Sequence, residues 1–477
     1  MCRFLLFFLV FFTLYINFAV EMQKELNRKI LALTLPSIVS NITVPLLGLC
    51  DVTIMGHVGG ASHIGAIAVG SMIFNVMYWL FGFLRMGTSG LTAQALGAHN
   101  LQQSAAMLRR GLRLAVAIGL GIILLQWPLK HLAFFLMQPG ADVAALCSTY
   151  YNICVWGAPA MLSLYVLMGW FVGMQNTRIP MVIAIGQNVV NIATSLLLVV
   201  GLGMDIRGVA TGTVVAQWAG LLAAVLLLYR YYGRMLRRHL SGKPGTPGIP
   251  GNPGSPGSSY SSFFRLNLDI FLRTLCLVSV NLYFTSAGAV QGATILAANT
   301  LLLQFFMFFS YVMDGFAFAG EALSGRYYGG GNRPMFRQTV IHIFGWGCLV
   351  AALFTAVYWS CGALFLRWLT SDAAVVALAA DYLPWVWVIP FAGMAAFVWD
   401  GIFIGITATR GMFIACLVAS VAFFLIFFLC FPTLQNHALW LAFIVYLLLR
   451  GLVQTLFDIL RQTNIYFPPK TWRIGEI

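Results

Sequence analysis

The chain has 477 residues, of which 60% are hydrophobic and only 8% are charged. A soluble globular protein is about 25% charged, and the mean hydropathy here is +0.88. Because so few charges cannot cover a water-exposed surface, the composition excludes a soluble enzyme, a secreted disulfide scaffold and a disordered protein. The apolar residues form long runs, and as helices such runs cross a hydrocarbon core of about 30 Å. The sequence predicts an all-α polytopic membrane protein.

Hydropathy predicts twelve transmembrane spans, followed in two places by amphipathic connectors at the membrane surface, residues 88–108 and 319–338. Three of the spans are longer than a perpendicular helix requires, so we expect tilt or a kink. The spans are residues 30–56, 62–85, 111–136, 143–172, 178–203, 208–231, 268–290, 294–318, 339–364, 375–408, 410–432 and 436–460.

Residues 1–29 form an N-terminal extension that contains an additional apolar run, FLLFFLVFFTLYINFAV, at positions 4–20. This run is a thirteenth helix, an uncleaved signal-like segment, or the translation product of an upstream start. No small-residue cleavage site follows it, and Met22 opens a segment, MQKELNRK, that suits a cytoplasmic N-terminus. We therefore favour Met22 as the true start.

The remaining chain divides into an N-terminal lobe with helices 1–6 (30–231), a cytoplasmic linker (232–267), a C-terminal lobe with helices 7–12 (268–460) and a cytoplasmic tail (461–477). The linker carries five Gly-X-Pro triplets between Gly242 and Pro256. Five triplets on one chain are too few for a collagen triple helix, so we interpret them as a solvated, polyproline-like tether.

The two lobes contain similar short segments. AQALGA at 93–98 corresponds to GEALSG at 320–325, an offset of 227, and GMQNTR at 173–178 corresponds to GITATR at 405–410, an offset of 232. Two matches at nearly one offset predict a parallel six-plus-six duplication. Transporters with parallel repeats place the substrate path near the interface of the repeats.

The formal net charge of +14 is explained by topology rather than by nucleic-acid binding. If the segment before Lys24 is cytoplasmic, 21 Lys and Arg residues fall in cytoplasmic connections and three (Lys130, Arg207 and Arg367) in outer ones. Arg85 and Arg450 remain unassigned, as does Arg3. The positive-inside rule then places both ends of the twelve-helix body in the cytoplasm.

The sequence lacks the motifs of ATP-driven pumps and of hydrolytic enzymes. It contains no GxxxxGK[ST], HExxH or GxSxG pattern, and its nine cysteines and seven histidines have no metal-ligand spacing. We therefore expect no enzymatic activity, no metal and no cofactor.

Carboxylates inside apolar spans are the strongest candidates for function, because each is costly unless it faces a cavity or a partner. Asp51 lies in the first span, and burial favours the neutral form of a carboxyl group. Asp51 is therefore a candidate for proton exchange near neutral pH. Asp314, Glu321 and Asp400 are candidates in the C-terminal half. For all four, the alternative is a structural carboxylate satisfied by local donors.

Two features of the N-terminal half are placed to act on Asp51. Asn188 and Asn191 are three residues apart, so they share a helical face and can donate to it; the alternative is polar contact between helices. Pro36 and Pro45 each remove a backbone hydrogen bond within the first span. They permit a bend that would move Asp51, although a static kink is equally compatible with the sequence.

These residues resemble the multidrug and toxic-compound extrusion (MATE) family, and within it the DNA-damage-inducible F (DinF) branch. The resemblance extends from about Leu33 to about Leu456. The segments that resemble the family are LTLPSIVSNITVPLLGLCD (33–51), FLRMGTSGLTAQALG (83–97), DGFAFAGEALSG (314–325), DGIFIG (400–405) and NHALWLA (436–442).

The resemblance implies an antiporter with two six-helix lobes that exports lipophilic, often cationic compounds in exchange for H⁺ or Na⁺. Asp51 matches the carboxylate implicated in cation coupling, and Asn191 and Thr213 match its polar partners. Asp314, Glu321 and Asp400 match acidic positions of the C-terminal lobe. Many members carry a second aspartate where this chain has Ser195. The loss of that charge favours H⁺ over Na⁺.

Three other functions remain open at this stage. A flippase for lipid-linked saccharides would favour several cations inside the spans, an intramembrane enzyme would need a nucleophile and base at helical spacing, and a sensor would use the tether as a partner site. The favoured interpretation is a monomeric, proton-coupled efflux carrier in the bacterial inner membrane. Its expected partners are small lipophilic substrates and membrane lipids, not nucleic acid.

Overall fold

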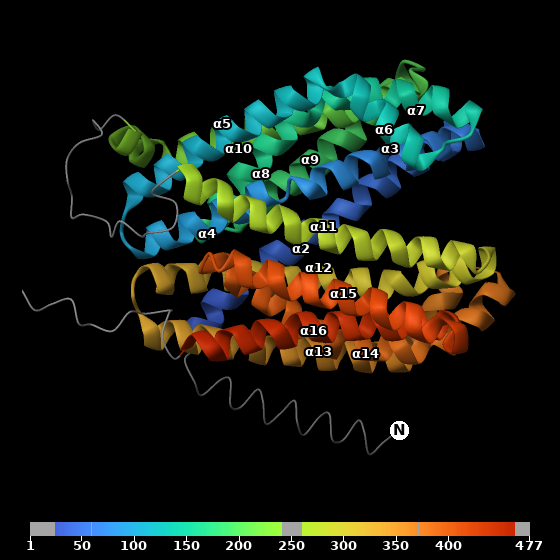
Figure 1. The fold of residues 1–477 in the computed structure, drawn as a ribbon. Coiled ribbons are helices and arrows are strands. Elements are labelled where there is room, and N and C mark those ends of the chain that lie inside the picture. Colours follow the sequence, from blue (N-terminus) through green and yellow to red (C-terminus); the bar gives the residue numbers. More distant parts are fainter. Residues whose placement is uncertain (1–23, 59, 241–259, 371, 463–477) are drawn as a thin grey trace, which may run out of the picture. The chain divides into compact units, whose positions relative to one another are not determined.

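The computed structural model describes residues 24–58, 60–240, 260–370 and 372–462, which form helices joined by short turns (Figure 1). The apolar run at 4–20, Met22, the Gly-X-Pro linker and most of the predicted tail lie outside these residues. Within them, the backbone has no regular structure other than helix. The α-helices are α2 (Lys24–Val58), α3 (Ala61–Leu80), α4 (Phe83–Gly97), α5 (Leu101–Leu124), α6 (Gln126–Met137), α7 (Ala141–Cys154), α8 (Ala158–Gly173), α9 (Arg178–Leu196), α10 (Asp205–Leu240), α11 (Tyr260–Val290), α12 (Ala293–Gly329), α13 (Arg333–Leu369), α14 (Ala373–Gly405), α15 (Thr409–Leu434) and α16 (Asn436–Gln462).

The described residues contain ten helices that are long and apolar enough to cross a membrane. An eleventh is present if α5 and α6, which meet at a bend of 72°, count as one span. The predicted first span, 30–56, lies within α2, which is not among these helices. The all-helical membrane fold is thus confirmed, whereas the number of twelve spans stays a prediction.

The predicted surface connectors are wrong. Most of α4 is buried, and α12 continues unbroken to Gly329 with buried residues as far as Gly325. The reason is that both segments are rich in Gly, Ala, Ser and Thr, and small residues allow two helix backbones to approach closely.

One close helix crossing occurs twice along the chain. A methyl group at Gly169 or Gly173 of α8 would collide with the carbonyl oxygen of Arg85 or Ser89 in α4. In the second half, Gly401 and Gly405 of α14 meet the carbonyl oxygens of Ala317 and Glu321 in α12 in the same way. All four positions of the second crossing lie 232 residues after those of the first, which is the offset of one of the two sequence matches.

Two compact units make up the described chain, and the division between them falls inside helices. The N-terminal unit runs from Pro36 to Phe271, and the C-terminal unit comprises the described residues up to Leu35 and from Leu272 onward. The beginning of α2 is therefore part of the C-terminal unit, where the side-chain oxygen of Asn27 lies 2.9 Å from His342 Nδ1 and accepts from Trp346 Nε1 at 3.2 Å.

The beginning of α11 belongs to the N-terminal unit in the same manner. There the ring of Phe271 lies edge-on to Phe83 of α4, with centroids 6.2 Å apart.

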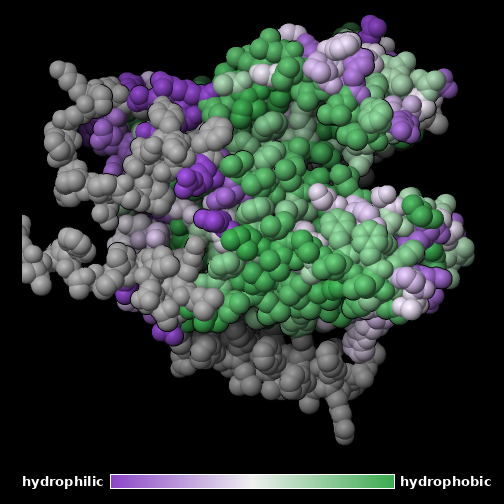
Figure 2. All heavy atoms as spheres, in the orientation of Figure 1, coloured by the Kyte–Doolittle hydropathy of each residue, from purple (hydrophilic) through white to green (hydrophobic). Residues whose placement is uncertain are grey.

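On the face seen in Figure 2, hydrophobic side chains cover the middle of the helices in each unit and hydrophilic ones gather towards the helix ends. This distribution is typical of helices that cross a membrane.

We predict that Gly401→Ala destabilises the protein by about 1–3 kcal/mol, because the added methyl overlaps the backbone of α12. Thermal unfolding of the detergent-solubilised protein measures the effect. The control is Gly393→Ala on the same helix, where the methyl would lie 3.5 Å from Phe309, an ordinary contact. Equal unfolding temperatures for the two variants would contradict the close crossing.

Candidate functional site

Asp51 is buried in the N-terminal unit and has little to stabilise a charge. Its side chain is 3% exposed, and its contact in the described residues is the hydroxyl of Thr213, which donates to Oδ2 at 3.5 Å. That distance is long for an O–H···O bond, whose usual length is about 2.7–2.8 Å. The same hydroxyl lies 3.1 Å from the carbonyl oxygen of Val209, which competes for its hydrogen.

Asn191 extends this contact into a chain of polar groups across three helices. Its amide nitrogen donates to Thr213 Oγ1 at 3.2 Å, so the order is Asn191 on α9, Thr213 on α10 and Asp51 on α2. The structure thus brings together three of the residues that the sequence singled out. Asn191 reaches Asp51 through Thr213, not directly.

Two oxygens of this group, Asp51 Oδ1 and Asn191 Oδ1, lack a hydrogen-bond partner among the described residues. The hydroxyl of Ser195, on the same helix as Asn191, also lacks one. A buried polar atom without a partner costs about 1–3 kcal/mol, and an unpaired buried charge costs more. The group is therefore suited to the neutral acid, or to a cation or hydrogen-bond donor that approaches Asp51 from outside the chain.

Asn188 is used elsewhere. Its amide nitrogen donates to the backbone oxygen of Thr43 at 2.7 Å, which ties α9 to α2. Asn188 precedes Asn191 by almost one helical turn, and Thr43 precedes Asp51 by about two turns on α2. This contact joins two helices and does not orient Asp51, which was the role predicted for Asn188.

Ser195 is fully buried against the backbone of α10. Its hydroxyl occupies the place where a side chain at Gly212 would begin. A longer carboxylate at this position would require α10 to move. Moreover, the described residues contain no group of three or more His, Cys, Asp and Glu that could hold a metal ion.

Asp400 of the C-terminal unit has the opposite surroundings. Its Oδ2 accepts hydrogen bonds from Arg273 on α11 and from Arg450 on α16, the latter at 2.7 Å, and its Oδ1 accepts from Gln454 at 2.7 Å. All four side chains are buried. The prediction left open whether Asp400 is functional or locally satisfied, and these contacts favour local satisfaction.

The other two carboxylates of this unit are both on α12. Glu321 is buried and Asp314 is half-buried, seven residues apart on one face of the helix. Glu321 lies in the close crossing of α12 with α14, where its backbone oxygen faces Gly405.

Sequence reasoning missed the partners of Asp400. It assigned Arg273 to a cytoplasmic connection and left Arg450 without a place, whereas both side chains are buried. A signal was present, because Arg450 and Gln454 are four residues apart in an apolar span and therefore share a helical face.

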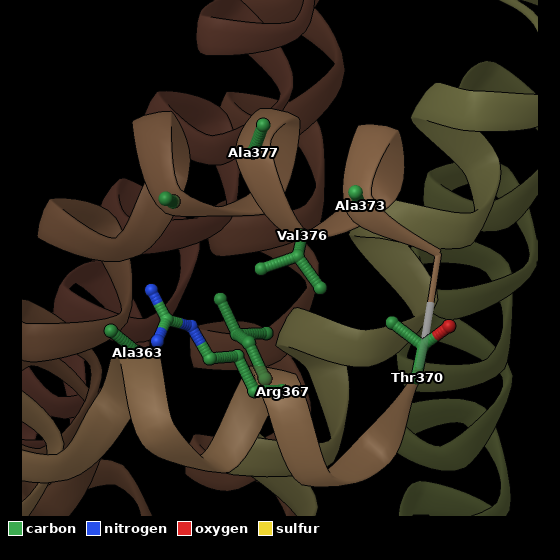
Figure 3. A pocket seen from close by; sticks show the side chains of 8 residues that line it. Ala363, Arg367, Thr370, Ala373, Val376 and Ala377 are labelled. Atoms are coloured by element: carbon green, nitrogen blue, oxygen red, sulfur yellow. The ribbon is translucent and has the colours of Figure 1, made fainter.

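A pocket of about 520 Å³ lies in the C-terminal unit, away from the residues predicted for the site. Ala373, Val376 and Ala377 of α14 line it opposite Arg367 of α13 and Thr370, which directly follows α13 (Figure 3). Apart from one guanidinium and one hydroxyl, its lining consists of alanine, valine and leucine side chains. None of the candidate carboxylates contributes to it.

We predict that Ser195→Ala changes the free energy of unfolding by less than about 0.5 kcal/mol, because the hydroxyl that it removes has no partner among the described residues. Ser195→Asp is expected to be destabilising by more than about 1 kcal/mol, since the carboxylate has neither space nor a counter-charge beside Gly212. Unfolding temperatures in detergent measure both. A fully stable Ser195→Asp variant would contradict the described packing.

Comparison with known proteins places the chain in a family. The MatE family model matches residues 36–197 and 270–429. The chain is 38% identical over 424 residues to the DNA damage-inducible protein F of Escherichia coli (strain K12), covering 88% of this chain and 89% of that protein. It is 24% identical over 394 residues to a probable multidrug resistance protein NorM of Photorhabdus laumondii, covering 81% and 84%.

Solved structures have the same fold. A MATE protein in its bent conformation matches with a TM-score of 0.79 at 17% identity, covering 92% of this chain and 96% of that one. The MATE transporter VcmN of Vibrio cholerae matches with a TM-score of 0.80 at 15% identity, covering 92% and 98%. The family model, which covers more than half of the chain, and the relative from Escherichia coli lead to one conclusion: this protein belongs to the multidrug and toxic-compound extrusion family, in the DinF branch.

Proposed function

We propose that this protein is a secondary active transporter that exports lipophilic, often cationic compounds in exchange for H⁺. The observation that carries the proposal is Asp51, a carboxyl group buried in the N-terminal unit with one long hydrogen bond and no cation within contact in the described residues. Relatives named as multidrug resistance and multidrug extrusion proteins support the class of substrate. The chain is thus a carrier in a bacterial inner membrane, not an enzyme.

A single carboxylate explains how export is coupled to proton entry. The surroundings of Asp51 stabilise an uncharged state, which it reaches either by taking up a proton or by binding a cation. These two states exclude each other, so a proton that arrives releases the compound and a compound that arrives releases the proton. Thr213, held by Asn191, orients one oxygen of Asp51 in the arrangement that the structure describes.

Sodium fits these residues less well than a proton. A hard cation such as Na⁺ is normally bound by several oxygen ligands, including charged ones. Ser195 supplies a hydroxyl where many members have a carboxylate, and it is packed against Gly212. One carboxylate suffices for H⁺, so we assign H⁺ as the coupling ion.

The energy available from one proton is sufficient. A charge that crosses 100 mV gains about 2.3 kcal/mol, so a proton driven by roughly 170 mV supplies nearly 4 kcal/mol. Since about 1.4 kcal/mol corresponds to tenfold in concentration, one proton sustains a gradient of a neutral compound of several hundred-fold. A one-for-one exchange with a monovalent cation moves no net charge, so it is driven by the pH difference alone. Export therefore requires no ATP.

The two prolines of α2 are proposed to let Asp51 move during this cycle. Pro36 stands at the division between the compact units, and Pro45 lies six residues before Asp51. Each lacks the N–H that a straight helix uses, so bending is less costly there than elsewhere in α2. A bend at these positions would change the distance from Asp51 to Thr213.

A flippase for lipid-linked saccharides is not favoured. Such a carrier needs unpaired cations to bind phosphate groups. The buried arginines of the C-terminal unit, Arg273 and Arg450, both donate to Asp400. Asp51 offers a phosphate no positive charge, and in its ionised form it would repel one.

We predict that Asp51→Asn abolishes proton-driven transport, because an amide cannot take up and release a proton. The assay follows a fluorescent organic cation in liposomes under an imposed pH gradient and then under an imposed Na⁺ gradient. Wild type should respond to the pH gradient, and Asp51→Asn should lose at least about tenfold in rate.

The matched control is Asp142→Asn, which removes an exposed carboxylate of the same unit. It should transport at the wild-type rate. Transport driven by Na⁺ alone, or a full response to the pH gradient by Asp51→Asn, would contradict the assignment of H⁺ to Asp51.

A further inference from the structure

We propose that Arg273, Asp400, Arg450 and Gln454, here called the charge clamp, form a fixed positioning element that exchanges neither protons nor cations during transport. The proposal rests on the proposed function, and it assigns the whole of the coupling chemistry to the N-terminal unit. Asp400 would then be a positioning residue, although an acidic residue inside a span is ordinarily a candidate for ion translocation.

The contacts of Asp400 occupy three of about four lone-pair sites of its carboxylate. Two guanidinium groups donate to Oδ2 and one amide donates to Oδ1. The donors come from α11 and α16, and Asp400 itself lies on α14. The carboxylate therefore joins three helices of the C-terminal unit at one point.

Charge keeps Asp400 ionised throughout. Arg273 and Arg450 are both buried, and neither has a second carboxylate within contact in the described residues. Protonation of Asp400 would leave two buried guanidinium charges without a counter-ion, which is far more costly than the ionised cluster. A carboxyl group that does not become protonated cannot bind a proton and a substrate in alternation.

The aromatic side of the clamp adds to its rigidity. The guanidinium carbon of Arg450 lies 5.5 Å from the ring centre of Tyr446, a cation–π contact that becomes stronger when water is excluded. Tyr446 is itself fully buried and lies 3.9 Å from Cys416 of α15. Through this contact α15 joins α11, α14 and α16 at the charge clamp.

The position of Arg273 indicates what the clamp holds in place. Arg273 is the second residue of α11 within the C-terminal unit, since the division falls between Phe271 and Leu272. The clamp therefore fastens α11 where this helix enters the unit. It gives the C-terminal unit a rigid end of α11, whereas the start of α11 belongs to the other unit.

The first test compares a variant that removes only the carboxylate of the clamp with a variant that removes all of its charged and polar side chains. Asp400→Asn leaves two buried cations unpaired, so we expect at least about a tenfold loss of monodisperse protein. A clamp-free variant replaces all four residues with apolar ones of similar volume: Arg273→Met, Asp400→Leu, Arg450→Met and Gln454→Met. Removing all the charges together avoids the unpaired state, as in other proteins with buried ion clusters.

The clamp-free variant should be monodisperse and should transport the fluorescent cation under a pH gradient within about threefold of wild type. A clamp-free variant that is monodisperse and binds the cation, yet no longer responds to the pH gradient, would overturn the proposal. So would an Asp400→Asn variant that is as stable as wild type.

The second test uses the wild-type protein and needs no variant to fold. Dicyclohexylcarbodiimide attacks carboxyl groups in apolar surroundings only when they are protonated, and mass spectrometry identifies the modified residue. We expect modification of Asp51 and none of Asp400. The access control is Arg273→Met with Arg450→Met, in which Asp400 loses its cations, becomes neutral and should react.

The outcomes at the two aspartates are independent. Modification of Asp400 in the wild-type protein would overturn the charge clamp, whatever happens at Asp51. If Asp51 reacts at acidic pH, which shows that the reagent reaches it, but does not react at neutral pH, the result would instead contradict the proposed function, because this residue would then carry no proton at neutral pH. The two claims can therefore fail separately.

Discussion

The central constraint on this protein is the cost of a carboxylate in an apolar helical interior, where the group must be neutral or fully paired. The two units meet it in opposite ways. Asp400 is surrounded by two guanidinium groups and an amide, so its charge is permanent and its position fixed. Asp51 has one long contact with Thr213 and an oxygen without a partner among the described residues. Only the second arrangement allows the charge to change.

A repeated scaffold carries this unequal chemistry. The glycine crossing of α8 with α4 returns 232 residues later as the crossing of α14 with α12, with the same backbone contacts. The first helix of each half is divided between the two units in the same way. The division falls between Leu35 and Pro36 in α2, and between Phe271 and Leu272 in α11. The packing of small residues is thus kept in both halves, whereas the buried polar residues differ.

The helical fold, the family and the parallel offset were predictable from the sequence, because hydropathy, spacing and motifs are local properties. The grouping of Asp51 with Asn191 and Thr213 was implied only by the resemblance to the family, since Asp51 and Thr213 are 162 positions apart. The contacts that define Asp400 were not predictable. Arg273 and Arg450 are 177 positions apart along the chain, and no periodicity indicates that they meet. Likewise, the three-residue spacing correctly placed Asn188 and Asn191 on the face of α9 that contacts α2. It did not indicate that Asn188 donates to Thr43 and not to Asp51.

The most direct test of the account is whether substrate binding expels a proton from Asp51. Purified protein in weakly buffered detergent solution, with a pH-sensitive dye, is titrated with an organic cation. The account predicts that wild type releases a proton for each cation bound and that Asp51→Asn releases none. It also predicts that the clamp-free variant still releases protons. Release that persists unchanged in Asp51→Asn would contradict the account, because the exchanged proton would then come from another group.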